Sequence, residues 1–365
     1  MKFGARDLRG TQRGVAKSYG MYPNDSANGS RREMLKTVGL GAAALGLGSV
    51  LSSPALGASS GLTGATKRNP WIYAFNIGDL QAWSISDGFM KFRKGLEMMY
   101  PESERESMKE MLIDNFEPTD FLPLYVNVLV VKSDSEVMLF DAGFGIVKNA
   151  DRGWLREGLK EIGIAPRDVT AAFLSHAHGD HINGFVNPDG GLMFPNAVIY
   201  TTPEEFKFWR QKEHDFSKSR RNPRAIPGLI KNAQKQFEIL KPQIETAAVG
   251  KKVLGGTVEV VDGFGHTPGH GLFRISSAGE SLLHIMDIVH SHLLMFRDPA
   301  WSIGLDHTPE LAVETRRRVF SMAARDRTPC YGFHVPWPGI GGIAKQGSGY
   351  AWVPARNWWM ETPKG

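Results

Sequence analysis

The 365-residue chain is long enough for one large domain or two modest ones, and its 42% hydrophobic and 22% charged residues are typical of a globular protein. This composition excludes a disordered chain, a collagen and a polytopic membrane protein. The net charge of +5 lies within residues 1–57, because 35 basic and 35 acidic residues follow from position 58 onward. A nucleic-acid partner is therefore not expected. The single cysteine, Cys330, excludes an intrachain disulfide and a thiolate zinc cluster.

Residues 1–57 have the three parts of an export signal. Arg31-Arg32 precedes an apolar stretch of 15 small and aliphatic residues (37–51), and small side chains then suit cleavage after Gly57. The paired arginines resemble a twin-arginine signal, although Met34 stands where that pattern favours Phe. The stretch is shorter than the roughly 20 residues that span a bilayer. We therefore expect a cleaved leader, no lasting membrane anchor, and a periplasmic or secreted protein.

A polar linker is expected over residues 58–70, followed by one folded domain over 71–365. Aromatic and β-branched residues on either side of a Gly-Asp pair predict a hairpin over 71–88. Residues 124–143 read as two strands joined by a polar turn. Apolar residues at helical spacing, ended by a glycine, predict a helix over 153–164.

The rest of the chain alternates between strand and helix patterns. Strands are expected over 169–176 and 197–202, strand pairs over 253–263 and 271–287, and a last strand running into His334. Helices are expected over 203–209 and 309–324. Residues 211–250 are polar and proline-containing, and are interpreted as helical pieces and loops on the surface. Meandering strands followed by strand–helix alternation indicate an α/β protein with a mixed sheet system.

The most informative segment is His176-Ala177-His178-Gly179-Asp180-His181, which places four metal-capable side chains directly after an apolar strand. Its spacing is that of a tight loop, with two histidines on one side and an Asp-His pair on the other. One cation cannot easily use all four from so short an arc, so two adjacent metal sites are the natural solution. A solvated polar loop is the alternative, and it is disfavoured because the chain has only 11 histidines.

Three distal residues support a metal site. His266, Asp287 and His334 each stand at the carboxyl end of a predicted strand, where loops gather and sites form in layered α/β folds. Imidazoles and carboxylates are suitable ligands for Zn²⁺ without thiols.

The pattern His-x-His-x-Asp-His, followed by a distal His, an Asp and a final His, resembles the metallo-β-lactamase superfamily. Asp141-Ala142-Gly143 is similar to its Asp-x-Gly turn, and the sequence GHTPGH to its third ligand loop. The similarity is greater to the methyl parathion hydrolase and lactonase-like branch, through IGDLQAWSISDG, FPNAVIYTTPEEFKFW, DIVHSHLL, TRRRVF and HVPWPGIGGIAKQGSGYAWVP. It covers about residues 70–356 and implies a four-layer αβ/βα sandwich with a dinuclear site along one edge.

The resemblance also implies a ligand for each position. One zinc would be held by His176, His178 and His266, and the other by Asp180, His181 and His334, with Asp287 bridging both. A hydroxide shared by two zinc ions would be the nucleophile, and the second metal would stabilise developing negative charge. Asp180 is expected to act in catalysis by orienting that nucleophile and moving a proton. Met286 departs from the family, where Gly is common before the bridging residue.

Other residues near these loops are expected to play supporting roles. His270, His290 and His292 would hydrogen-bond ligands, and Asp141 would brace the metal loop. A strand position is expected for His284, and surface positions for His214 and His307. The aromatic residues Phe206, Phe208, Trp209, Phe333 and Trp337 are more often core than substrate contacts, and Cys330 is expected to be buried and unreactive.

The leading hypothesis is therefore a dizinc hydrolase of ester-like bonds, in a lactone or a phosphotriester, acting on a small molecule. A homodimer is the oligomeric state considered for it. The family's true β-lactamases lack the bridging carboxylate that Asp287 would provide, so β-lactam hydrolysis is the alternative. A non-catalytic metal-binding protein of the same fold is a further alternative. Clustered His and Asp side chains without metal or function would be costly, which disfavours it.

Overall fold

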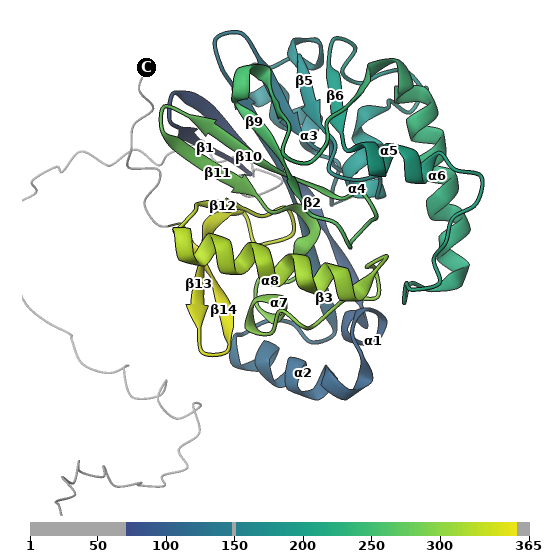
Figure 1. The fold of residues 1–365 in the computed structure, drawn as a ribbon, viewed down its shortest axis with the longest axis vertical. Helices are drawn as coiled ribbons and strands as arrows, with labels where there is room; N and C mark the ends of the chain where they lie inside the picture. The colour runs from purple at the N-terminus through teal and green to yellow at the C-terminus, as the bar shows by residue number, and fades with distance from the viewer. Residues whose placement is uncertain (1–70, 148–150, 356–365) are drawn as a thin grey trace, which may run out of the picture. The chain divides into compact units, whose positions relative to one another are not determined.

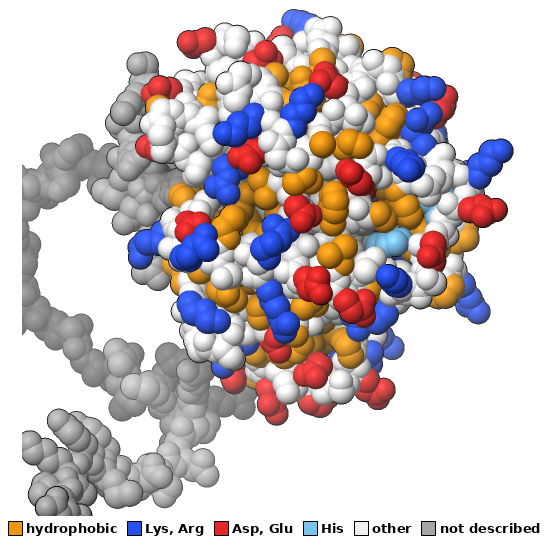
Figure 2. Space-filling view, in the orientation of Figure 1, with side chains coloured by type: hydrophobic (Ala, Val, Ile, Leu, Met, Phe, Trp, Pro, Cys, Tyr) orange, Lys and Arg blue, Asp and Glu red, His pale blue; other side chains and the backbone are white. Residues whose placement is uncertain are grey.

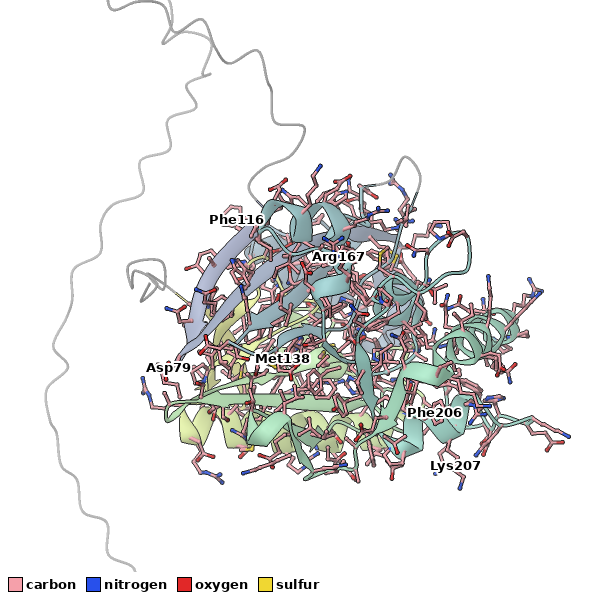
Figure 3. All side chains as sticks on the ribbon, turned by 90° about the horizontal axis from the view of Figure 1, so that it is seen from above. Asp79, Phe116, Met138, Arg167, Phe206 and Lys207 are labelled. Carbon is pink, nitrogen blue, oxygen red and sulfur yellow. The ribbon has the colours of Figure 1, made fainter. Side chains whose placement is uncertain are left out.

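The computed structural model describes residues 71–147 and 151–355. The expected leader (1–57) and linker (58–70) lie outside the described residues. Within them the chain folds into two seven-stranded sheets with helices on their outer faces, which confirms the four-layer α/β sandwich. In Figure 3 the purple-to-teal strands of the first sheet lie above the green-to-yellow strands of the second, with helix α8 along the lower side.

The first sheet has the strand order β1-β2-β3-β4-β5-β6-β7. Neighbours from β1 to β4 are antiparallel, and those from β4 to β7 are parallel. The turn between β1 and β2 uses Gly78 at a φ of 57°, a conformation that glycine adopts without steric cost. The strands are β1 (Ile72–Ile77), β2 (Leu80–Arg93), β3 (Phe121–Lys132), β4 (Val137–Phe140), β5 (Ala171–Phe173), β6 (Val198–Thr201) and β7 (Ile244–Thr246).

The second sheet has the order β14-β13-β12-β11-β10-β9-β8. Only β11 and β12 pair in parallel; the other neighbours are antiparallel. The strands are β8 (Lys252–Val253), β9 (Val258–Asp262), β10 (Gly271–Ser277), β11 (Glu280–His284), β12 (Cys330–Tyr331), β13 (Ile340–Gln346) and β14 (Gly349–Pro354).

Helices cover the outer faces of both sheets (Figure 1). On the first sheet, α3 packs against β2, while α4 and α5 each contact α6; on the second, α8 packs against β13 and α7 against β14. The helices are α1 (Gly95–Met99), α2 (Arg105–Asp114), α3 (Leu155–Glu161), α4 (Gly179–Ile182), α5 (Pro203–Trp209), α6 (Ile226–Leu240), α7 (Leu294–Arg297) and α8 (Pro309–Asp326). Among the described residues, no helix combines the length and apolar character needed to cross a bilayer.

The core lies between the two sheets and joins them through aromatic rings. Phe140 and Phe173 stack with ring centroids 4.8 Å apart, and Phe273 of the second sheet meets Phe173 edge-on at 5.3 Å. The buried hydroxyls of Ser84 and Tyr331 lie 2.8 Å apart, so a hydrogen bond also connects β2 with β12. These contacts fix the relative position of the sheets, and therefore of the loops at their shared edge.

The structure confirms the predicted hairpin at the start, the two strands around residue 130, and the helices after Gly153, Pro203 and Pro309. Two expectations were incomplete. The polar segment 211–250 contains the 15-residue helix α6 and the edge strand β7. The strand before His334 is not the last, because the hairpin β13–β14 follows it. On the face drawn in Figure 2, basic and acidic side chains are interspersed.

Candidate metal centre

The seven candidate ligands converge at one edge of the sandwich. His176, His178, Asp180 and His181 follow β5 of the first sheet, whereas the other three follow strands of the second sheet. His266 comes after β9, Asp287 after β11 and His334 after β12. Six of the seven are buried, and Asp180 is partly exposed, with 13% of its side chain accessible. The segments thus meet although 158 positions separate the first and last of these residues.

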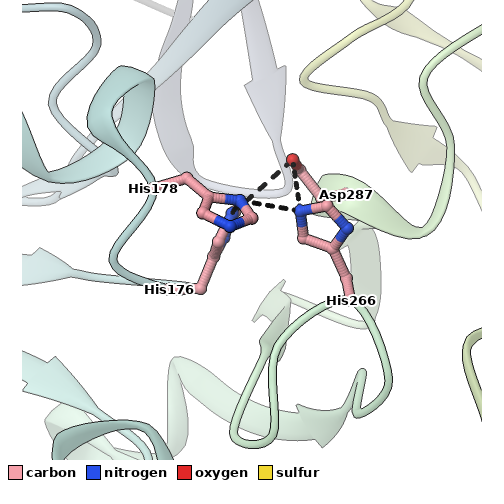
Figure 4. A group of neighbouring side chains, drawn as sticks. All are labelled: His176, His178, His266 and Asp287. Carbon is pink, nitrogen blue, oxygen red and sulfur yellow. Dashed lines mark hydrogen bonds and ion pairs between the residues drawn. The ribbon is translucent and has the colours of Figure 1, made fainter. Parts of the chain in front are cut away.

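The first donor set consists of His176, His178, His266 and Asp287 (Figure 4). His178 Nδ1 lies 2.8 Å from His176 Nε2 and 2.9 Å from His266 Nε2. Asp287 Oδ2 lies 3.6 Å from His176 Nε2 and 3.3 Å from His266 Nε2. Ligand atoms at the corners of a tetrahedron around Zn²⁺ would be about 3.3 Å apart, given Zn–N distances of about 2.0–2.1 Å. The donors therefore fit one zinc ion.

The second donor set consists of Asp180, His181 and His334, with Asp287 beside them. Asp180 Oδ2 lies 3.7 Å from His181 Nε2 and 3.5 Å from His334 Nε2. Asp287 Oδ1 lies 3.3 Å from His181 Nε2, and neither of these buried atoms has a hydrogen-bond partner among the described residues. Buried polar atoms without partners are costly. A cation at this position would satisfy both.

The two sets differ in the charge that they favour. Burial, reinforced by neighbouring positive groups, holds the pKa values of His176, His178 and His266 well below their usual range, which keeps these imidazoles neutral as metal ligation requires. Burial also lowers the pKa of His181, but the carboxylates of Asp287, Asp180 and Asp141 outweigh it, and the pKa is raised well above the usual range.

The pKa of His334 shifts in the same direction as that of His181. Burial opposes its protonation, whereas Asp287 and Asp180 favour it more strongly, so its pKa is raised. Burial raises the pKa of Asp287 itself, but His181, His334 and His176 outweigh burial and hold it well below its usual range. The second set therefore favours a positive charge, which either protons or a metal cation can supply.

A buried carboxylate braces the histidine loop as expected. Asp141 Oδ1 accepts a hydrogen bond from the Ser175 amide at 2.8 Å, and Oδ2 accepts one from the Ser175 hydroxyl at 2.6 Å. The same Oδ2 lies 2.7 Å from His181 Nδ1, so this carboxylate orients the imidazole with Nε2 toward Asp287. Asp141 is therefore a partner of a candidate ligand and not a ligand itself.

Other residues around the candidate ligands carry no recognisable sequence signal. Asp306 Oδ1 lies 2.9 Å from His266 Nδ1, and the buried Arg316 guanidinium lies 3.8 Å from the other oxygen of Asp306. Arg221, in the polar segment before α6, places a guanidinium nitrogen 3.0 Å from His178 Nε2 and donates to the Leu305 carbonyl at 2.8 Å. Only the tertiary fold brings these groups to the site.

The remaining histidines divide into two groups. Near the site, His270 Nε2 accepts from the Asp287 amide at 3.3 Å, and His290 Nε2 lies 3.2 Å from Asp287 Oδ2. Both therefore contact a candidate ligand, and His290 also belongs to a third donor group with Asp287 and His334. Away from it, His292 faces Glu117, while His284 is buried and His214 and His307 are half-buried.

The aromatic residues considered for a pocket lie mainly in the core. Phe208, Trp209 and Phe333 are buried, Phe206 is half-buried against α6, and Trp337 is half-buried. Cys330 is fully buried, as expected.

Met286, next to Asp287, begins the short 3₁₀ turn Met286–Ile288 at a φ of 43°. Glycine adopts this left-handed conformation without steric cost, whereas a residue with a Cβ adopts it with strain.

Comparisons with known proteins agree with this geometry. No curated protein matches the sequence. The structure of AidC, a dizinc quorum-quenching lactonase, is 28% identical with a TM-score of 0.75, covering 78% of this chain and 98% of that chain. The hydrolase AbOPH of the β-lactamase superfamily is 26% identical with a TM-score of 0.72, covering 80% and 99%. A family model matches residues 122–334, so the chain belongs to the metallo-β-lactamase superfamily.

Proposed function

We propose that the protein is a dinuclear zinc hydrolase that opens ester-like bonds in small molecules, either lactones or phosphotriesters. The superfamily and its hydrolase neighbours support hydrolysis in general. The lactone class is supported by AidC, which is a dizinc lactonase and aligns over most of the described chain.

The position of Asp287 carries the proposal. Its carboxylate lies between the two donor sets. Oδ2 faces His176 and His266 of the first set and His334 of the second, and Oδ1 faces His181 of the second. A carboxylate so placed can serve both metals, whereas a single-metal site would need no shared residue. The first zinc would be held by His176, His178 and His266, the second by Asp180, His181 and His334, and Asp287 would join both. Zinc at such a site would supply an activated water and polarise the scissile oxygen.

Asp180 is the residue to which we assign proton transfer. It is the most exposed of the seven donors, and its Oδ2 faces both His181 and His334. One carboxylate oxygen can bind metal while the other accepts a proton from the attacking water and holds the nucleophile in line. The buried imidazoles have no second function of this kind, because their outer nitrogens are already occupied by Asp141, Asp306 and other partners.

The proposal is tested by metal analysis and a hydrolysis panel on the purified protein. We expect two zinc ions per chain and hydrolysis of lactones or phosphotriesters that a chelator abolishes and added zinc restores. Asp287→Ala should reduce both metal content and activity, whereas Asp79→Ala, an exposed control, should change neither. Hydrolysis of a chromogenic β-lactam alone would favour the β-lactamase alternative, and two bound metals without any of these activities would reject the substrate class.

Export through a twin-arginine signal is a separate proposal, based on Arg31-Arg32 and the apolar stretch after them. That route carries folded proteins, which suits an enzyme loaded with metal before export. We expect Arg31→Lys with Arg32→Lys to retain the protein inside the cell. Undiminished export of the double variant would refute this route. Homodimer formation is likewise proposed, and light scattering of the purified protein would test it.

A further inference from the structure

Glu205 is a fully buried carboxylate outside both donor sets. It lies in the first turn of α5, where the Thr202 hydroxyl caps the helix by accepting from the Glu205 amide at 3.1 Å. Its neighbour Glu204 is exposed. A buried carboxylate is costly unless several donors face it, so its contacts show what it holds together.

The two oxygens of Glu205 bind two different ligand loops. Oε1 accepts from the Ala177 amide at 2.9 Å, between His176 and His178, and from the Trp209 indole. Oε2 accepts from the Thr267 hydroxyl at 2.6 Å and from the Gly269 amide at 3.1 Å, in the loop that carries His266. One carboxylate therefore connects the two loops that carry the three histidines of the first donor set. In the histidine segment its contact is at Ala177, between His176 and His178, whereas His181, farther along in α4, is held by Asp141.

The backbone around Glu205 is shaped for this contact. A Cβ at Gly269 would lie 1.9 Å from the Glu205 amide nitrogen, so only glycine lets the loop approach α5 this closely. The Thr202 hydroxyl donates to the Gly269 carbonyl, and the Gly271 amide donates to the Ser175 carbonyl at 3.0 Å. The loop positions are thus set by a hydrogen-bond network in which the Glu205 carboxylate is the acceptor shared by both loops.

We propose that Glu205 is a positioning residue that sets the spacing between the His176–His178 loop and His266, and so determines metal affinity at the first donor set and not at the second. This inference rests on the proposed dinuclear site. Burial raises the pKa of Glu205 to about 7 even with four donors facing it. An apolar residue would fill the same space at lower cost, but it could not accept four hydrogen bonds from two separate loops.

The test compares Glu205→Gln with Glu204→Gln. Glutamine keeps the shape of the side chain, but its NH2 group would face loop donors instead of accepting from them. We expect zinc affinity at the first donor set to fall by about tenfold or more, the usual effect of losing such a partner. Affinity at the second set should be unchanged, and Glu204→Gln should match the wild type at both.

Cobalt substitution identifies which position is affected. In the cobalt-loaded protein, paramagnetically shifted imidazole N–H signals arise separately from the ligands of each set. Glu205→Gln should weaken those of His176, His178 and His266 at limiting cobalt, while those of His181 and His334 persist. If Glu205 only stabilised the fold, its replacement would weaken both groups of signals equally. It would also lower the unfolding temperature of the metal-free protein.

Thr267→Val is the second variant, in case Glu205→Gln does not fold, because it removes a single donor to Oε2. We expect Thr267→Val to lower zinc affinity by a smaller factor, at the first donor set alone. Thr267→Ser keeps the hydroxyl and should therefore bind zinc like the wild type. Wild-type affinity at the first set in both Glu205→Gln and Thr267→Val, or equal loss at both sets, would overturn the inference. A wild-type protein that binds fewer than two metals would instead refute the proposed function.

Discussion

Met286 provides a stability prediction that follows from backbone geometry. Its φ of 43° lies in the left-handed region, and its side chain is fully buried beside Asp287. At an ordinary helical or extended position, alanine is more stable than glycine by about 0.5–1 kcal/mol. At a left-handed position the Cβ itself costs roughly 1–2 kcal/mol, which reverses the order. We therefore expect Met286→Gly to be more stable than Met286→Ala.

Both variants lose a buried methionine side chain, which costs about 2–5 kcal/mol relative to the wild type. Relief of the left-handed Cβ, less the entropy cost of glycine, leaves Met286→Gly more stable than Met286→Ala by up to about 1.5 kcal/mol. The wild type should remain the most stable of the three, because the packing of the side chain outweighs the strain.

Urea unfolding of the metal-free protein measures both differences. Met108 is the matched control, since it is equally buried but lies within α2. At this helical position the free energy of unfolding of Met108→Ala should exceed that of Met108→Gly by about 1 kcal/mol. If alanine were the more stable substitution at both positions by the same margin, the strain assigned to Met286 would be refuted.

Two further predictions concern other buried groups. Asparagine tolerates the φ of 55° at position 141, but Asp141→Asn leaves either Ser175 or His181 without an acceptor. Zinc affinity at the second donor set, measured by competition with a chelating dye, should therefore fall about 10–100-fold. Unchanged affinity would contradict the bracing role. Burial raises the pKa of the Cys330 thiol to about 12. Thiol reagents should therefore leave Cys330 unmodified in the native protein and label it fully in urea. Rapid labelling of the native protein would contradict the burial of this side chain.

The sequence predicted most of the fold because its strands and helices have strong local patterns. The hairpin turn at Gly78 and the proline that begins α5 are local signals, and the structure confirms both. Strand β7 and the hairpin β13–β14 were missed. β7 has only three residues, none of them buried, and β13 contains two glycines at Gly341 and Gly342, so neither shows an apolar alternation. Their pairing depends on contacts with neighbouring strands.

The candidate ligands were predictable because metal binding requires a few residue types at strand ends. The structure brings all seven together, from two sheets. Their partners were not predictable in the same way. Glu205 stands beside the similar Glu204 in sequence, and only the orientation of α5 decides which of the two is buried. Asp306 lies in a loop without a motif, 40 positions from His266, and only the tertiary fold gives it a role.

These partners determine which nitrogen of each imidazole faces the centre. The Nδ1 atoms of His181, His266 and His334 face acceptors, namely Asp141, Asp306 and the Tyr125 carbonyl. Each Nδ1 can therefore carry the proton, which leaves Nε2 with a lone pair directed inward, as a metal ligand requires.

His178 differs from the other histidines, because the group facing its outer nitrogen, Nε2, is the guanidinium of Arg221, which can only donate. A cation at Nδ1 requires the proton to sit on Nε2, where two donors would then oppose each other. Ligation by a neutral His178 and the contact with Arg221 therefore exclude one another. Because Arg221 also donates to the Leu305 carbonyl, the guanidinium can give up His178 and still keep a protein partner. Among His178, His181, His266 and His334, His178 is the one at which metal binding requires a side chain to rearrange.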